Sequence, residues 1–150
     1  NRLISKSRNL EISKFPIIWW HRGTTRANGW TKSKRMKKAF RWMWNNAMEI
    51  KVFDSPLEKF LISLEKNTRA KVLRTLDLLE VFGNNLGMPH SKKITGDLFE
   101  LRIRGRQEIR ILYTFYRSQI ILLHGFMKKT PKIPPKELKI AAKKLESINE

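Results

Sequence analysis

The 150-residue chain contains no cysteine, so disulfide bonds and thiolate metal sites are excluded. Long apolar runs are also missing: none approaches the roughly 20 residues that a membrane-spanning helix needs. The longest near the N-terminus, residues 16–20, is too short for the apolar core of a signal peptide. These absences predict a cytoplasmic protein that does not associate with a membrane.

Acidic residues are scarce. Only 13 Asp and Glu stand against 32 Lys and Arg, which leaves a formal net charge of +19. Such an excess concerns the partners of a protein more than its fold, and it indicates polyanions such as RNA, DNA, an acidic membrane surface or an acidic protein segment. Binding of nucleic acid by bulk charge releases counterions but carries no sequence specificity.

Cofactor motifs are absent as well. The three histidines, at positions 21, 90 and 124, lack the spacing of metal ligands, and the few carboxylates form no tight cluster. There is no glycine-rich phosphate loop of the kind that nucleotide hydrolases use. We therefore expect neither a metal ion nor another cofactor.

The composition changes near residue 48. All five tryptophans lie before it, together with 12 of the 32 basic residues and only one acid, Glu11. Within this part, residues 32–44 have the pattern of a basic amphipathic helix. We expect residues 1–47 to be a basic N-terminal extension, either an appendage or sequence upstream of a true start at Met48, and residues 48–150 to be one domain.

The domain begins with regular local patterns. Residues 49–53 alternate with the period of a strand. A helix opens at Ser55, which pairs with Glu58 as a capping box. A second helix runs from Asn67 to a terminating Gly83, and the short connection between the two predicts an antiparallel helical hairpin.

The second half of the domain is strand-rich. Residues 84–96 are polar, contain glycine and proline, and are expected to form a loop. Three strand-like runs separated by short turns then predict an antiparallel meander: residues 98–104, 108–116 and 119–127. A final helix follows Pro134. The predicted fold is α+β, in the order β-α-α-β-β-β-α, with helices on one face of an antiparallel sheet and the functional site on the other, partly open face.

Several strings in this half carry a family resemblance. They are LFELRIR at residues 98–104, IRILY at 109–113, LHGFMKKT at 123–130 and PPKE at 134–137. With the helical hairpin, they resemble the RelE/ParE superfamily of toxins, most of all its phage-derived HigB-like branch. The resemblance covers residues 48–150. It implies the toxin of a type II toxin–antitoxin pair, bound by a cognate antitoxin that carries a helix-turn-helix DNA-binding domain.

The resemblance leaves the target open. RelE- and HigB-like members cut mRNA on the ribosome without a metal, whereas ParE-like members inhibit DNA gyrase and cut no RNA. We expect the first activity, with the 2′-hydroxyl of the RNA as nucleophile. The alternatives are a gyrase inhibitor and an inactive remnant that binds nucleic acid through bulk charge.

Strand alternation predicts where the arginines point. The apolar residues of 98–104 share one face, so Arg102 and Arg104 share the other. Arg110 is flanked by core residues and is expected to project outward too. The three guanidiniums then form a phosphate clamp. The alternative is a solvated basic face balanced by Glu100 and Glu108.

The expected catalytic residues are Arg110, Lys129 and His124. Lys129 and Lys128 follow the last strand, where similar positions in the superfamily carry cations that neutralise the transition state; otherwise they belong to an ordinary basic loop. His124 has the parity of the core residues Ile120 and Leu122. It is either a general base or acid, or a hydrogen-bonded core residue.

Four further residues are candidates for binding RNA. Tyr113 and Tyr116 are candidates for stacking on bases, although the parity of Tyr113 also favours core packing. His90 and Lys92 lie in the polar stretch 84–96, from which they either reach RNA or form part of a simple polar loop.

Overall fold

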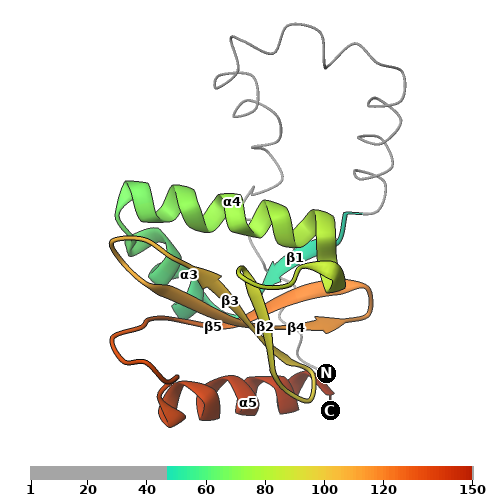
Figure 1. Ribbon diagram of the computed structural model, residues 1–150. Coiled ribbons are helices and arrows are strands. Elements are labelled where there is room, and N and C mark those ends of the chain that lie inside the picture. Colours follow the sequence, from blue (N-terminus) through green and yellow to red (C-terminus); the bar gives the residue numbers. More distant parts are fainter. Residues whose placement is uncertain (1–46, 150) are drawn as a thin grey trace, which may run out of the picture. The chain divides into compact units, whose positions relative to one another are not determined.

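The computed structural model describes residues 47–149 (Figure 1), so the predicted basic helix at 32–44 lies outside the described residues. The elements follow in the order β1 (Glu49–Val52), α3 (Ser55–Ser63), α4 (Lys66–Phe82), the 3-10 helix η3 (Gly83–Asn85), β2 (Ser91–Thr95), β3 (Leu98–Ile103), β4 (Ile109–Tyr116), β5 (Gln119–Met127) and α5 (Pro135–Asn149). No helix in this part of the chain is long and apolar enough to cross a membrane.

The strands form one mixed sheet in the order β1-β5-β4-β3-β2. The three long strands make the predicted antiparallel meander, while β1 pairs with β5 in parallel. Arg117 and Ser118 form the turn between β4 and β5 with φ of 46° and 61°, the left-handed conformation that two-residue hairpins require. The predicted α+β fold is confirmed, with one strand more than expected.

The additional strand is β2, which the sequence predicted as a loop. Its side chains are mostly polar because it is an edge strand: Lys92 and Lys93 are exposed, and lysines at a sheet edge discourage pairing with another chain. Ser91 points inward, where its hydroxyl lies 2.6 Å from the Tyr113 hydroxyl. A buried serine paired with a tyrosine does not produce the apolar alternation by which strands are recognised.

Helices cover both faces of the sheet (Figure 1). The hairpin of α3 and α4 lies on one face and α5 on the other. The expectation that helices leave one face open is therefore wrong. The cluster under α3 and α4 includes Leu57, Leu76 and Ile111, and the cluster under α5 includes Leu112 and Phe126. The face under α5 is the one on which Lys92, Arg102, Arg110 and His124 lie.

The first helix is capped by Asp54 and not by Ser55. Asp54 Oδ1 accepts the Leu57 N–H at 3.1 Å, and the second carboxylate oxygen lies 2.7 Å from Lys144 Nζ of α5. Gly83 ends α4 as predicted, with φ of +48°. A Cβ at this position would lie 2.8 Å from Met48 Sδ, so the site favours glycine both by conformation and by space.

Candidate nucleic-acid interface

The sheet register aligns four of the predicted site residues in two rows across the face under α5: Lys92, Arg102, Arg110 and His124. In one row, Lys92 of β2 lies opposite Glu100 of β3, and Leu112 of β4 lies opposite His124 of β5. In the next row, Arg102 lies opposite Arg110, and Arg110 opposite Phe126. Residues directly opposite one another point to the same face of a sheet.

His90 directly precedes the edge strand β2 and lies next to the second row. The Arg102 N–H donates to the His90 carbonyl at 2.7 Å, which places His90 next to Arg102. Arg102 Nη1 also lies 3.6 Å from the sulfur of the exposed Met88. The loop before β2 therefore borders Arg102, and two residues that the sequence assigned to separate segments lie side by side.

Glu100 holds two of the predicted arginines. Arg102 Nε donates to Glu100 Oε2 at 2.8 Å, and Arg110 Nε lies 3.0 Å from Oε1. The second contact is an ion pair only, because its geometry is not that of a hydrogen bond. Arg110 Nη2 donates in addition to Glu108 Oε2 at 2.9 Å. Four charged side chains thus form one network across β3 and β4.

Burial divides the three predicted clamp arginines. Arg110 is only 4% exposed, so the expectation that it projects from an open face is wrong. The side chain of Arg110 does point to the predicted face of the sheet, but neighbouring residues on that face bury it. Arg102 is half-buried and Arg104 exposed. Arg102 and Arg104 can therefore meet a phosphate directly, whereas Arg110 serves as the buried counter-charge of Glu100 and Glu108.

His124 lies on the opposite face from the one its parity predicted. The register of β4 and β5 shifts at Leu112/Tyr113, where Leu112 pairs with His124 but Tyr113 with Leu122. This β-bulge adds a residue to β5 and reverses the alternation. His124 therefore faces α5, where its Nε2 is hydrogen-bonded to Oε2 of Glu137.

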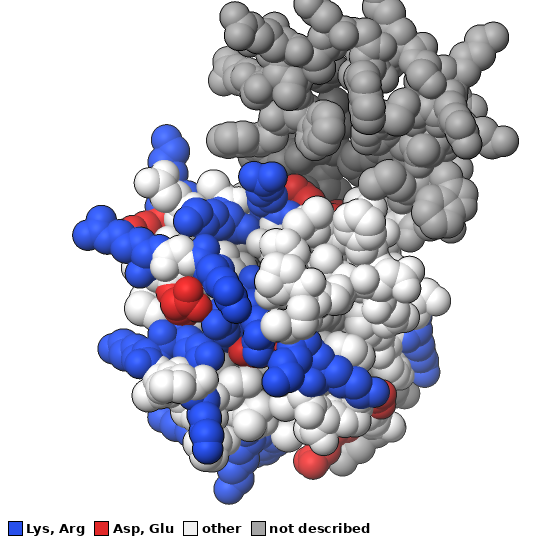
Figure 2. Space-filling view, viewed as in Figure 1, with Lys and Arg blue, Asp and Glu red and all other residues white. Residues whose placement is uncertain are grey.

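The predicted lysines border the same face at the end of β5. The Lys128 N–H donates to the Glu108 carbonyl at 2.7 Å, which continues the sheet by one row. Lys128 is half-buried and Lys129 exposed. In Figure 2, Lys and Arg side chains gather on the left of the described part, where Figure 1 has the β3–β4 turn and the β5–α5 loop. The right-hand side of that view is mostly uncharged.

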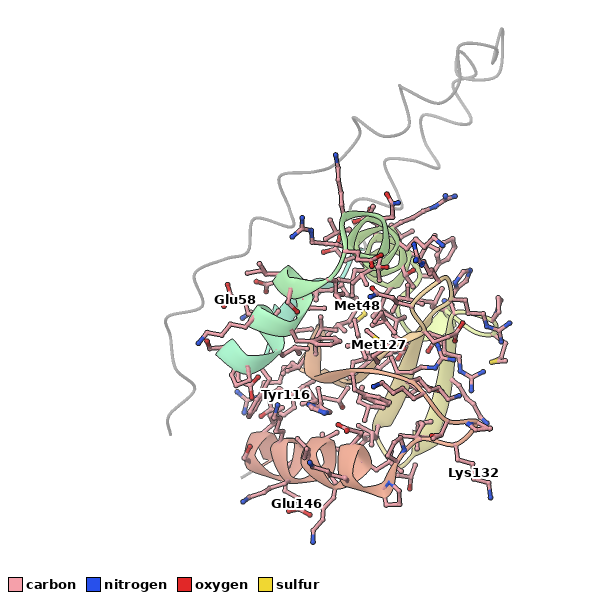
Figure 3. The ribbon with its side chains drawn as sticks, turned by 90° about the vertical axis from the view of Figure 1, so that its left-hand side faces the viewer. Met48, Glu58, Tyr116, Met127, Lys132 and Glu146 are labelled. Carbon is pink, nitrogen blue, oxygen red and sulfur yellow. The ribbon has the colours of Figure 1, made fainter. Side chains whose placement is uncertain are left out.

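The two tyrosines do not join this group. Tyr113 is 1% exposed and packs in the core under α3 and α4, so its ring is not available for stacking on a base. Burial raises the pKa of its hydroxyl, and the hydrogen bond with Ser91 partly opposes this. Tyr116 lies opposite Gln119, at the other end of β5 from the lysines. Figure 3 likewise separates Tyr116 from Lys132.

Glu137 is the site residue that sequence reasoning missed. It belongs to the PPKE string, but nothing in a linear sequence pairs it with His124, 13 residues earlier. One feature of the sequence could have pointed to Glu137: it is an acidic residue in the first turn of α5, the helix that packs back onto the sheet. Among the described residues, no group of three His, Asp or Glu could hold a metal ion.

A mixed sheet with a helical hairpin on one face and a C-terminal helix on the other is consistent with the RelE-like fold. The chain belongs to the family described as Phage derived protein Gp49-like (DUF891), which matches residues 59–146. This family is part of the RelE/HigB-like toxin group, so the coarser part of the predicted resemblance is confirmed. No curated protein matches the chain.

Proposed function

We propose that this protein is the toxin of a type II toxin–antitoxin pair and cuts mRNA on the ribosome in the cytoplasm without a metal ion. The observation that carries the proposal is the two-row face, on which Arg102, Lys92 and His124 come from three different strands. Lys128 continues the same face at the end of β5. This arrangement puts phosphate-binding cations and an imidazole on one face of the sheet, which supports a site for the phosphodiester backbone of RNA.

The RNA supplies its own nucleophile in this reaction. His124 accepts the proton of the 2′-hydroxyl as general base, the 2′-oxygen bonds to the adjacent phosphorus, and the bond from phosphorus to the 5′-oxygen breaks. The departing 5′-oxygen takes a proton from a lysine ammonium, for which Lys129 is our candidate. The products are a 2′,3′-cyclic phosphate and a 5′-hydroxyl. Arg102 and Lys128 stabilise the negative charge that builds up at phosphorus.

The antitoxin is the expected protein partner. A segment that neutralises the toxin would cover the basic side in Figure 2, and an acidic segment would complement its charge. The proposal therefore predicts that antitoxin and mRNA compete for Arg102 and Lys128.

The test is primer extension on a reporter mRNA after brief induction of the full chain. Arg102→Ala is the informative variant, because Arg102 is partly exposed, whereas Arg110→Ala would leave Glu100 buried beside a missing counter-charge. Arg117→Ala is the matched control, since Arg117 lies over the Tyr116 ring at the far end of β4. We expect cuts within translated codons, lost in Arg102→Ala and kept in Arg117→Ala.

Two results would contradict the proposal. Arrested growth with intact mRNA, together with inhibition of DNA supercoiling by the pure protein, would establish a gyrase inhibitor. Absence of any toxicity would indicate a remnant that binds nucleic acid through bulk charge alone.

A further inference from the structure

His124 and Glu137 form a pair between the sheet and α5. His124 comes from the end of β5 that follows the bulge, and Glu137 from the first turn of α5. Their side chains keep 19% and 23% of their surfaces exposed, so the pair lies at the edge of the packed region and solvent still reaches it. The ring of Phe126 stacks beside the imidazole, with centroids 6.1 Å apart and planes at 22°.

The position of α5 relative to His124 is fixed independently of this pair. Lys144, two turns further along α5, donates to the carbonyl of Leu123 at 2.8 Å. Leu123 is the bulge residue that precedes His124. The helix that carries Glu137 is thus attached to the residue next to the imidazole, and the carboxylate approaches the ring from a defined side.

We infer that Glu137 is a positioning residue, which holds the His124 ring with its proton on Nε2 and leaves Nδ1 as the nitrogen that exchanges a proton with RNA. The inference rests on the proposed nuclease function. A neutral imidazole carries one N–H, and the group that accepts from it decides which nitrogen keeps a lone pair. Here a carboxylate is the acceptor, so Nε2 is the donor. Nδ1 makes no hydrogen bond with any residue of the described part.

The pair also gives the reaction a defined geometry. His124 is a diagonal neighbour of Arg110, about 7–8 Å away between Cα atoms, and Arg110 is held by the same Glu100 that holds Arg102. When Nδ1 takes the proton of the 2′-hydroxyl, the charge of the imidazolium faces the Glu137 carboxylate. No further proton moves, because Nε2 keeps its own. Glu137 acts through His124 and does not touch the RNA.

The first test is spectroscopic. Long-range correlations between the ring nitrogens and protons of ¹⁵N-histidine in the full chain report the tautomer, and the loss of a signal in His124→Gln assigns His124. We expect the Nε2–H tautomer in the wild type and in Glu146→Ala, and a mixture of tautomers in Glu137→Ala. Glu146 is the matched control: it is exposed on α5, on the side away from the sheet in Figure 3. An Nδ1–H tautomer in the wild type would overturn the inference.

The second test is a double-mutant cycle measured by single-turnover cleavage of mRNA on programmed ribosomes. We expect Glu137→Ala to lower kcat about tenfold or more, which is part of what a general base contributes, with little change in KM. In a His124→Ala background the same substitution should cost nothing further, because Glu137 acts only through the ring. Glu137→Gln keeps a carbonyl that can accept from Nε2 and should recover part of the rate, which also guards against a variant that folds poorly.

The outcomes separate this inference from the proposed function. If the wild type leaves mRNA intact, the nuclease proposal fails and the inference fails with it. If the wild type cuts and Glu137→Ala cuts equally fast, only the inference is wrong. An equal loss in the presence and absence of His124 would show that Glu137 acts through another group and would also overturn it.

Discussion

Glu100 is a buried carboxylate that forms ion pairs with two arginines, Arg102 and Arg110. Its carboxylate is 1% exposed and faces Arg102 and Arg110 from the middle of β3. Removing one partner of a buried ion pair is costly because the remaining charge has neither water nor a counter-charge. The cost should be greatest for Arg110, which is 4% exposed, and smaller for Arg102, which can turn to solvent.

We predict that Glu100→Gln lowers the free energy of unfolding by about 3–5 kcal/mol, measured by urea denaturation. Glu108→Gln is the matched control, since Glu108 also pairs with Arg110 but keeps 39% of its side chain exposed. It should cost about 1 kcal/mol or less. Equal losses for the two variants would mean that Glu100 is not the centre of the network.

The sequence could not predict this arrangement at the residue scale. Alternation along β3 and β4 gave the correct direction for Arg102 and Arg110, because that direction depends only on local geometry. It could not tell that the surroundings of Arg110, which include the carboxylates of Glu100 and Glu108, would leave it buried. The assignment of His124 failed for a related reason: a single β-bulge, which no local pattern marks, reverses the alternation beyond it.

At the scale of elements, α5 is held to the sheet by more than apolar packing. Lys144 Nζ donates to the Leu123 carbonyl at 2.8 Å and lies 2.7 Å from Asp54 Oδ2, the residue that caps α3. It also lies 5.7 Å from the centre of the Phe53 ring. One side chain thus connects α5 to β5, which carries His124, and to the start of α3.

We predict that Lys144→Met destabilises the protein by about 1–3 kcal/mol, the usual cost of leaving a buried polar group without its partner. Methionine keeps most of the packing and removes the charge and the donor. Lys143→Met is the control, because Lys143 is exposed on the same helix, and its effect should stay within about 0.5 kcal/mol. The measurement is thermal unfolding of Lys144→Met and Lys143→Met. Equal melting temperatures for the two variants would contradict the prediction.

Helix α4 carries a carboxyl group that should make stability depend on pH. Desolvation by burial, with a smaller contribution from the Asp77 carboxylate, raises the pKa of Glu80 to about 7 from its usual 4.5. The folded protein therefore binds this proton more tightly than the unfolded chain does. The contribution of Glu80 is fully favourable below pH 4.5 and is lost as the pH rises to about 7.

We predict that the free energy of unfolding falls by about 1–2 kcal/mol between pH 5 and pH 8, a part of the full shift because Glu80 is not wholly buried. Glu80→Gln should remove most of this dependence and be the more stable protein at pH 8. Glu65→Gln, at the exposed start of α4, should keep the pH dependence of the wild type. A Glu80→Gln profile as steep as that of the wild type would refute the prediction.

Element boundaries were predicted well where one local signal dominates. Gln119–Met127 has the predicted bounds, and Gly83 ends α4 as expected, because a turn and a glycine with positive φ act locally. Strand β2 was missed because its side chains suit an edge and not a core. The parallel pairing of β1 with β5 joins residues about 70 positions apart, a distance over which local patterns carry no information.

At the scale of the whole molecule, charge decides which partners approach. The described part carries its cations unevenly, with Lys and Arg gathered on one side in Figure 2. A protein that bound RNA through bulk charge would be insensitive to which cations are removed. One that uses the two-row face and the cations that follow β3 and β5 would depend on four residues: Lys92, Arg102, Arg104 and Lys128.

We predict that binding of a short single-stranded RNA weakens about 50-fold between 50 and 200 mM salt if four such contacts form, since each contributes about 0.7 to the slope of log affinity against log salt. Replacing all four residues by alanine should abolish most of this slope. The control replaces four exposed lysines on α3, α4 and α5: Lys59, Lys66, Lys139 and Lys143. Both variants lose four positive charges. Filter binding across a salt series therefore measures the effect of where on the protein those charges lie. Equal slopes would show that the RNA responds to net charge and that the face of Arg102 has no special part in binding it.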